Sequence, residues 1–406
     1  MAVNSTTSVL HGEHGEHGEQ VAHGEHGEHG EHGEFVTSTR TSSRLANAIE
    51  STRDGIIGVP INDWSTIEVT PYDDDEMERW SPSVRQRIAF GELITTVRLS
   101  MNQIEKADSK PKKQPPVVKL QDGAGHPKAK SKGLRYDQIV WVSGVRNTDP
   151  LIGSKANRDG QIFHVLNYAD LRVDRRDEIT SQITDLLSFF SAVSGLNASQ
   201  HYYSFELLNV LLSVIEIVAM RMKHALAVPR PNRLSAQVQP MIPVPRHGSL
   251  PSGHATQAFA LAFILAQLNK NGPKQIETML MRLAARIAVN RTVAGVHYPV
   301  DNAAGMITGL ALAQYFWERC AGTRKTLYPW QFKAVEFGNK DFDWKELLEL
   351  FKNPRIKTPP PYLRAKIGQA YRPVDSTRPI FSANGDPKFK THPINWLFEK
   401  AIREWA

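Results

Sequence analysis

Residues 251–268 read PSGHATQAFALAFILAQL, and this stretch predicts a buried helix that begins at a polar cap. Ser252 is a natural N-cap, and apolar residues recur behind it at helical intervals. Gly253 lets an anion approach the backbone N–H groups at the positive end of the helix dipole. His254 lies in the first turn, where an imidazole beside a bound anion can act as a general acid. A capped turn without catalytic function is the alternative interpretation.

Helical periodicity continues on both sides of this stretch. Apolar residues recur at three- and four-residue intervals in 177–193, 203–225, 254–268, 274–294 and 299–318. The same spacing predicts helices over 80–106 and near 343–352 and 393–404. Alternating runs of β-branched residues are scarce, so the predicted fold class is all-α, a bundle of long helices with a disordered N-terminal tail.

Four segments are predicted along the 406-residue chain. They are a low-complexity tail (1–40), an N-terminal helical segment with a Lys/Pro-rich loop (41–134), a catalytic helical bundle (135–320) and a C-terminal wrap (321–406). The tail contains seven His-Gly-Glu repeats, and this composition indicates a disordered segment. The alternative interpretation is a segment that binds metal weakly. The basic stretch 109–133 has no aromatic residue for base stacking, so a solvated surface loop is favoured over nucleic-acid binding.

Charge and composition indicate the broad class of protein to which the chain belongs. The chain has 49 Lys and Arg against 42 Asp and Glu, and the acidic tail makes the remainder more basic than the net charge of +7 suggests. A single cysteine, Cys320, excludes an intramolecular disulfide framework and a cysteine zinc site. No secretory signal is visible, and Glu216 interrupts one of the most apolar segments. The sequence therefore predicts a soluble, cytoplasmic protein without a membrane span.

Two further blocks place charged residues at helix ends. Lys223 is followed after six residues by Arg230-Pro231, and two cations at one helix end suit a multiply charged oxyanion. Arg291, His297 and Asp301 surround one turn, where the carboxylate can bond one imidazole nitrogen and leave the other unprotonated. Alternatively, the cations of the first block only interact with the helix dipole, and His297 of the second block is a structural histidine.

The three blocks, K-x6-RP, PSGH and R-x5-H-x3-D, occur together in fixed order and with fixed internal spacing, which rarely arises by chance. They resemble the superfamily that joins type 2 phosphatidic acid phosphatases, bacterial non-specific acid phosphatases and vanadium-dependent haloperoxidases. The motifs cover residues 223–301, and the helical pattern around them extends the resemblance to roughly 175–320. The resemblance implies an anion cage formed by Lys223, Arg230, Ser252, Gly253, His254, Arg291 and His297.

The resemblance implies two chemistries for this cage. For a phosphate ester, His297 is the nucleophile that forms a phosphohistidine, Asp301 orients it, and His254 protonates the leaving group. For vanadate, His297 is the metal ligand, His254 moves a proton of bound hydrogen peroxide, and Lys223 activates the peroxide toward a halide. Phosphate is expected to fit the same site.

Chain length and the large flanking segments favour the second chemistry by resemblance. The predicted function is a vanadium-dependent haloperoxidase, an oxidoreductase that uses hydrogen peroxide to oxidise bromide or iodide and halogenates a small organic acceptor. His247 underlies the halide preference, because bromo- and iodoperoxidases of the superfamily look similar at that position. A homodimer or larger homo-oligomer is predicted by analogy, without nucleic acid.

Two alternatives stay open. The first is a soluble phosphatase that hydrolyses phosphate monoesters through a phosphohistidine. The second is a non-enzymatic role, in which the tail and the basic loop bind metal or an anionic polymer. The sequence also departs from the fungal haloperoxidases: Met220 stands where an aromatic residue is expected, and the connection from Arg230 to Ser252 is short. That connection contains Val238, Met241, Ile242 and Val244, which fit either an apolar substrate funnel or ordinary loop packing.

Overall fold

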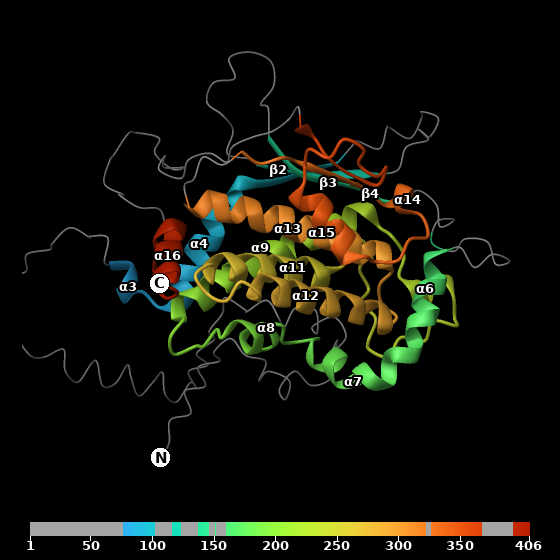
Figure 1. Ribbon diagram of the computed structural model, residues 1–406, viewed down its shortest axis with the longest axis horizontal. Helices are drawn as coiled ribbons and strands as arrows, with labels where there is room; N and C mark the ends of the chain where they lie inside the picture. The colour runs from blue at the N-terminus through green and yellow to red at the C-terminus, as the bar shows by residue number, and fades with distance from the viewer. Residues whose placement is uncertain are drawn as a thin grey trace, which may run out of the picture.

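The computed structural model describes residues 76–101, 116–122, 137–145, 151, 160–321, 326–367 and 393–406. Within these ranges a group of long helices lies against a five-stranded sheet (Figure 1). The His-Gly-Glu tail and most of the Lys/Pro-rich segment fall outside the described residues. The division of the chain into four segments therefore stays a prediction.

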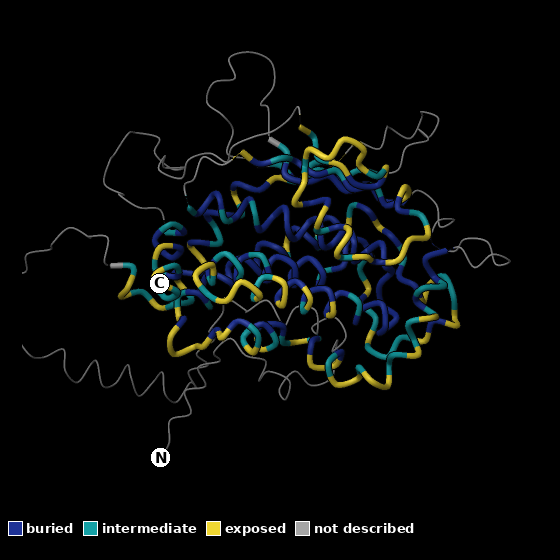
Figure 2. Tube along the Cα trace, in the orientation of Figure 1, coloured by how far each residue is buried: buried dark blue, intermediate teal, exposed yellow. Residues whose placement is uncertain are grey.

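Helix α11 (Gly253–Leu268) is the centre of the helical layer. It packs against α9 (Tyr202–Leu226), α12 (Ile276–Val293) and α13 (Pro299–Ala321). In Figure 2 most of α11 and α13 is coloured as buried, whereas α12 has exposed residues along one side. Because α11 is apolar around most of its circumference, surrounding it with three helices removes nearly all of that surface from water.

Two glycines on α13 allow it to approach α11 closely. A Cβ atom added at Gly305 would lie 2.7 Å from the Ser252 carbonyl oxygen, and one at Gly309 would lie 2.2 Å from the Thr256 carbonyl oxygen. At this crossing the N-terminal ends of the two helices meet, and the Ser252 N–H donates to the Asp301 carbonyl over 3.0 Å. The close crossing thus brings the PSGH block and Asp301 together.

We expect Gly309→Ala to destabilise the protein by about 3 kcal/mol, because the added methyl group meets backbone atoms that cannot move independently. Gly91→Ala is the matched control: nothing lies within 4 Å of its added Cβ. That substitution should stabilise the helix by up to about 1 kcal/mol. Urea denaturation of both variants measures the difference, and equal midpoints would contradict the close crossing.

The sheet has the strand order β1-β2-β3-β4-β5. Strands β3 and β4 are parallel, and the other neighbouring pairs are antiparallel. Val118 pairs with Val142 and Leu120 with Val140, and all four side chains are buried. The strands are β1 (Val97–Met101), β2 (Val117–Asp122), β3 (Asp137–Ser143), β4 (Trp330–Lys333) and β5 (Leu363–Ala365).

The all-α prediction is therefore wrong in its strict form: the described protein is mostly helical but contains this mixed sheet. The predicted helix over 80–106 ends at Thr96, where β1 begins, because Val97, Leu99 and Met101 also fit a two-residue period. The predicted loop over 109–133 contains β2. These strands are short, so their alternation was too brief to oppose the helical signal.

Six helices agree with their predicted ranges: α9, α11, α12, α13, α15 (Trp344–Lys352) and α16 (Pro393–Arg403). Besides 80–106, the exception is 177–193, which forms two helices separated by a turn at 182–186. The remaining helices are α3 (Glu76–Arg79), α4 (Pro82–Thr96), α6 (Gln161–Tyr168), the 3-10 helix η3 (Ala169–Leu171), α7 (Arg172–Ser181), α8 (Leu187–Ser194), α10 (Pro231–Leu234) and α14 (Ala334–Phe337).

Candidate active site

The predicted site residues meet where several helix ends converge. Lys223 lies in the last turn of α9, and Arg291 lies in the last turn of α12. The PSGH block starts α11, and Asp301 is in the first turn of α13. The structure brings together all nine predicted residues, which are Lys223, Arg230, His247, Ser252, Gly253, His254, Arg291, His297 and Asp301.

His297 is held from both sides of its ring. Its Nδ1 lies 2.9 Å from Asp301 Oδ2, and its Nε2 lies 3.0 Å from Arg230 Nη1. The imidazole is fully buried. Because the carboxylate accepts a hydrogen bond, the proton is assigned to Nδ1, which leaves the Nε2 lone pair directed toward the guanidinium.

Asp301 is a buried carboxyl group with two N–H donors on one oxygen. The His297 Nδ1–H and the Tyr298 backbone N–H reach Oδ2 over 2.9 and 3.0 Å. Burial raises the pKa of Asp301 to about 6, and this effect outweighs the opposing Tyr298 hydrogen bond and the positive charges of Lys223 and Arg230. Asp301 can therefore fix the ring of His297 fully only above this pH.

Arg230 connects His297 with His247. Its Nη1 donates to the Val296 carbonyl over 2.9 Å, and its Nε donates to the His247 carbonyl over 3.2 Å. Its Nη2 lies 3.1 Å from His247 Nδ1. His247, which is partly buried, thus contacts the cage through Arg230.

Lys223 lies beside the start of α11. Its Nζ is 3.3 Å from the Gly248 carbonyl oxygen, and its Cε would be 3.9 Å from a Cβ added at Gly253. Ser252 Oγ accepts the Ala255 N–H over 3.4 Å and caps the helix. The ammonium group and the first N–H groups of α11 therefore share one side of the cage, as the anion interpretation requires.

His254 and Arg291 meet at Gln182, a residue that sequence reasoning missed. His254 Nε2 lies 2.9 Å from the Gln182 carbonyl oxygen and 3.3 Å from Arg291 Nη1. Arg291 Nη2 donates to Gln182 Oε1 over 3.1 Å. Gln182 stands within a stretch that the apolar period predicts as continuous helix, and no local signal distinguished it.

A family comparison covers this part of the chain. Residues 204–322 match the PAP2 superfamily. This matched region, here called the PAP2 domain, contains all nine predicted site residues and omits Gln182. The coarser family prediction is confirmed by this match, whereas the haloperoxidase subtype is not.

One solved structure with a detectable likeness is the crystal structure described as the first transmembrane PAP2 type phosphatidylglycerolphosphate phosphatase from Bacillus subtilis. It is 17% identical and covers 41% of this chain and 89% of its own, with a TM-score of 0.31. No curated protein matches the chain.

The predicted vanadium-dependent haloperoxidase activity is corrected by these findings. The family match is to the PAP2 superfamily, and it agrees better with the phosphatase alternative than with the peroxidase interpretation. Oxidation of bromide or iodide by hydrogen peroxide, and the role of His247 in choosing the halide, are withdrawn with it. The flanking segments were a poor criterion, because length outside the motifs says nothing about chemistry inside the cage.

The predicted cytoplasmic location is also contradicted. The stretch Tyr202–Leu234 is long and apolar enough to cross a membrane, with a mean hydropathy of 1.7, although 72% of its apolar window is buried within the protein. Glu216 alone does not lower the mean hydropathy of this stretch sufficiently, so the prediction that no segment could span is not supported. The predicted oligomeric state stays a prediction.

The PAP2 domain presents the chemistry of an oxyanion site. Among the described residues, no group of three or more His, Cys, Asp or Glu side chains could hold a metal ion. The cage instead combines the guanidinium groups of Arg230 and Arg291, the ammonium group of Lys223 and a helix N-terminus. These donors fit a tetrahedral anion such as phosphate or vanadate.

The short connection between Arg230 and Ser252 packs against the protein. Val238 is buried, and Met241, Ile242 and Val244 pack on a small apolar cluster that includes Val293 and Val296. Of the two interpretations of this segment, the contacts favour ordinary packing.

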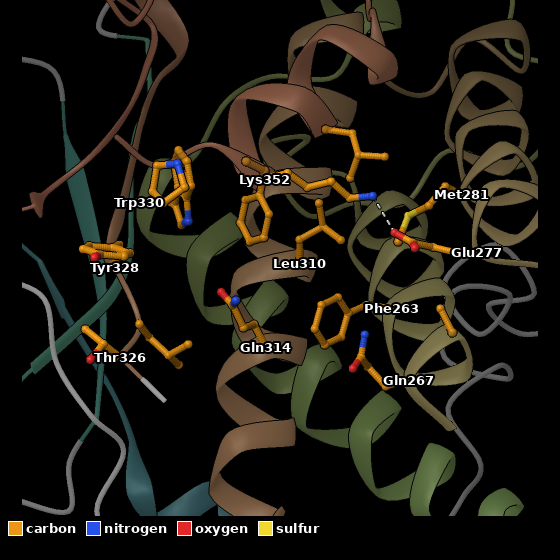
Figure 3. Close-up of a pocket in the computed structure, with 15 residues that line it drawn as sticks. Phe263, Gln267, Glu277, Met281, Leu310, Gln314, Thr326, Tyr328, Trp330 and Lys352 are labelled. Atoms are coloured by element: carbon orange, nitrogen blue, oxygen red, sulfur yellow. Dashed lines mark hydrogen bonds and ion pairs between the residues drawn. The ribbon is translucent and has the colours of Figure 1, made fainter. Parts of the chain in front are cut away.

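A cavity lies near the C-terminal end of α11 and beside α13 (Figure 3). It has a volume of about 300 Å³, and Phe263, Leu310 and Trp330 contribute to its apolar wall. Lys352 and Glu277 form an ion pair at its edge, with 2.6 Å between Nζ and Oε1. None of the predicted site residues lines this cavity, so it is separate from the cage.

Proposed function

We propose that the chain is a phosphatase that hydrolyses phosphate monoesters through a phosphohistidine at His297. The observation that carries this proposal is the position of His297, with Nδ1 on a buried carboxyl group and Nε2 beside Arg230. An imidazole held in this tautomer has a nucleophilic lone pair, and the neighbouring cations attract the phosphoryl group that it attacks.

In the first step, the Nε2 lone pair attacks phosphorus, and the bond between phosphorus and the ester oxygen breaks. His254 donates a proton to the departing oxygen, so the product leaves as an alcohol. Lys223, Arg230, Arg291 and the N–H groups at the start of α11 stabilise the charge on the phosphoryl oxygens. Asp301 accepts the Nδ1 hydrogen bond and stabilises the positive charge that develops on His297.

In the second step, water attacks the phosphohistidine. His254, now unprotonated, takes a proton from this water, and the bond between Nε2 and phosphorus breaks. Inorganic phosphate leaves, and both histidines return to their starting protonation states. The same residue thus serves as acid and then as base. We also propose that vanadate, which the sequence predicted as a cofactor, binds this cage in place of phosphate.

The test is an assay of aryl phosphate hydrolysis with and without orthovanadate, followed by denaturant trapping with a radiolabelled substrate. We expect turnover, competitive inhibition by orthovanadate, and a protein-bound label that is stable in base and labile in acid, as a phosphoramidate is. Absence of both hydrolysis and orthovanadate binding would overturn the proposal. Hydrolysis without any trapped label under rapid quenching would contradict the proposed covalent phosphohistidine intermediate.

Protonation of Asp301 is expected to lower kcat/KM on the acid side of the pH profile. We expect kcat/KM to fall about tenfold per pH unit below about pH 6, because the protonated carboxyl group no longer accepts the His297 hydrogen bond as a carboxylate. The effect on stability has the opposite sign. The folded-state pKa is above the ordinary value of 3.8, so the folded state holds more protons between about pH 4 and 6, and Asp301 lowers stability as pH rises through this window.

The measurement is a profile of kcat/KM in buffers of constant ionic strength, with thermal unfolding recorded at each pH. Asp301→Asn is the matched variant, because it retains the size of the side chain and removes the titrating group. A wild-type profile that stays level below pH 6 would contradict the role assigned to Asp301.

A further inference from the structure

The C-terminal end of α7 contacts the cage from outside the PAP2 domain. The Ile179 carbonyl oxygen accepts from Arg291 Nη2 over 3.1 Å, and the Gln182 carbonyl oxygen lies 2.9 Å from His254 Nε2. Carbonyl groups at a helix C-terminus carry partial negative charge and accept hydrogen bonds from cations. This end of α7 therefore supports two of the residues to which the proposed reaction assigns roles.

Gln182 is the point where these contacts meet. It is fully buried, and its Oε1 accepts from Arg291 Nη2 over 3.1 Å and from Asn290 Nδ2 over 3.0 Å. Two donors on one oxygen determine which way the amide is oriented. One residue thus contacts Arg291 through its side chain and His254 through its backbone.

A second layer holds Gln182 and Asn290 in place. Asn290 Nδ2 also donates to Glu178 Oε2 over 3.1 Å, and Asn290 Oδ1 accepts from Arg175 Nη1 over 3.0 Å. Glu178 pairs in turn with Arg286. These contacts bind α7 to α12 along one side, so that the position of Gln182 is tied to the helix that carries Arg291.

We propose that Gln182 is a positioning residue, which aligns the guanidinium of Arg291 with the anion in the cage. The proposal rests on the proposed phosphatase function for its catalytic consequence, but the alignment itself is a property of anion binding. A guanidinium that has several rotatable bonds loses affinity when its orientation is not fixed, because ordering it then accompanies binding. The Oε1 contact removes this freedom beforehand.

Gln182→Met tests the proposal, because methionine has a similar length and lacks the acceptor. The Gln182 Nε2 atom is buried without a hydrogen-bond partner among the described residues. Methionine removes that unsatisfied donor, so the melting temperature should change little. We expect orthovanadate affinity, measured by calorimetry, to fall about tenfold or more, as loss of a hydrogen bond to a charged group predicts. The kcat for an aryl phosphate should fall with it.

A double-mutant cycle with Arg291→Lys shows whether Gln182 acts through Arg291. Lysine lacks the Nη2–H group that donates to Gln182 Oε1, so Gln182→Met should weaken orthovanadate binding less than about threefold in that background. The matched control is Gln86→Met, since Gln86 is also a buried glutamine but lies on α4. Gln182→Leu provides a second variant should the methionine protein fail to fold.

The outcomes separate the two proposals. If the wild type binds orthovanadate and Gln182→Met weakens binding no more than Gln86→Met, the positioning role is wrong. An equal cost in the wild-type and Arg291→Lys backgrounds also overturns it. If the wild type neither binds orthovanadate nor hydrolyses the ester, the proposed function fails; if it binds orthovanadate without hydrolysis, the positioning role is still tested by affinity alone.

Discussion

His297→Ala is expected to abolish phosphate monoester hydrolysis, with kcat reduced by about 10⁴-fold or more. The reason is that the variant lacks the atom that bonds to phosphorus, and no other histidine contacts both Asp301 and Arg230 among the described residues. The trapped protein-bound label should disappear with the activity. Anion binding should be weakened less, because the three cations remain.

The measurement is steady-state hydrolysis together with acid- and base-quench trapping. His164→Ala is the control, since His164 lies on α6, contacts the Asn339 carbonyl and is not one of the predicted site residues. His297→Gly offers a further check: added imidazole should restore part of the turnover by acting as an external nucleophile. Retention of more than about one per cent of wild-type turnover by His297→Ala would contradict its role as nucleophile.

His254→Ala is expected to lose about 10²- to 10⁴-fold in the first turnover of an alkyl phosphate. The loss should be much smaller with a nitrophenyl phosphate, because a nitrophenolate leaves without being protonated. Orthovanadate affinity should stay within about threefold of the wild type, since the proton donor is not needed to hold the anion. The contrast between leaving groups distinguishes an acid from a residue that only supports Arg291.

The first turnover must be observed directly, because His254 also acts as the base in the second step. Rapid-mixing measurements of alcohol or phenol release separate the two steps. Gln182→Met serves as the comparison variant, because it disturbs Arg291 while retaining His254. Equal losses for alkyl and nitrophenyl substrates in the first turnover would rule out proton donation by His254.

Local rules explain why so much of the site was visible without a structure. Ser252 marks the start of α11, and Pro229 and Pro231 follow the end of α9, because capping and proline effects act within a few residues. The same rules placed Lys223, Arg291 and Asp301 in terminal helical turns, where the structure has them. Whether they act as assigned is a question for the variants above.

Other features depend on contacts between distant segments. Strand β3 pairs with β4 although nearly two hundred residues separate them in the chain, and each strand is too short to be recognised from its own period. Gln182 was missed for a related reason. Its importance comes from meeting Arg291 and His254, which are 109 and 72 positions away along the chain.

The sequence by itself determined which residue types stand at which helix ends, because periodicity, capping and proline effects depend on neighbours within one or two turns. Only the tertiary structure decided that these ends meet. Convergence requires the close crossing of α11 and α13 at Gly305 and Gly309 and the packing of α7 against α12. Such contacts depend on the shape of the whole folded chain, since each partner is positioned by packing against elements remote in sequence.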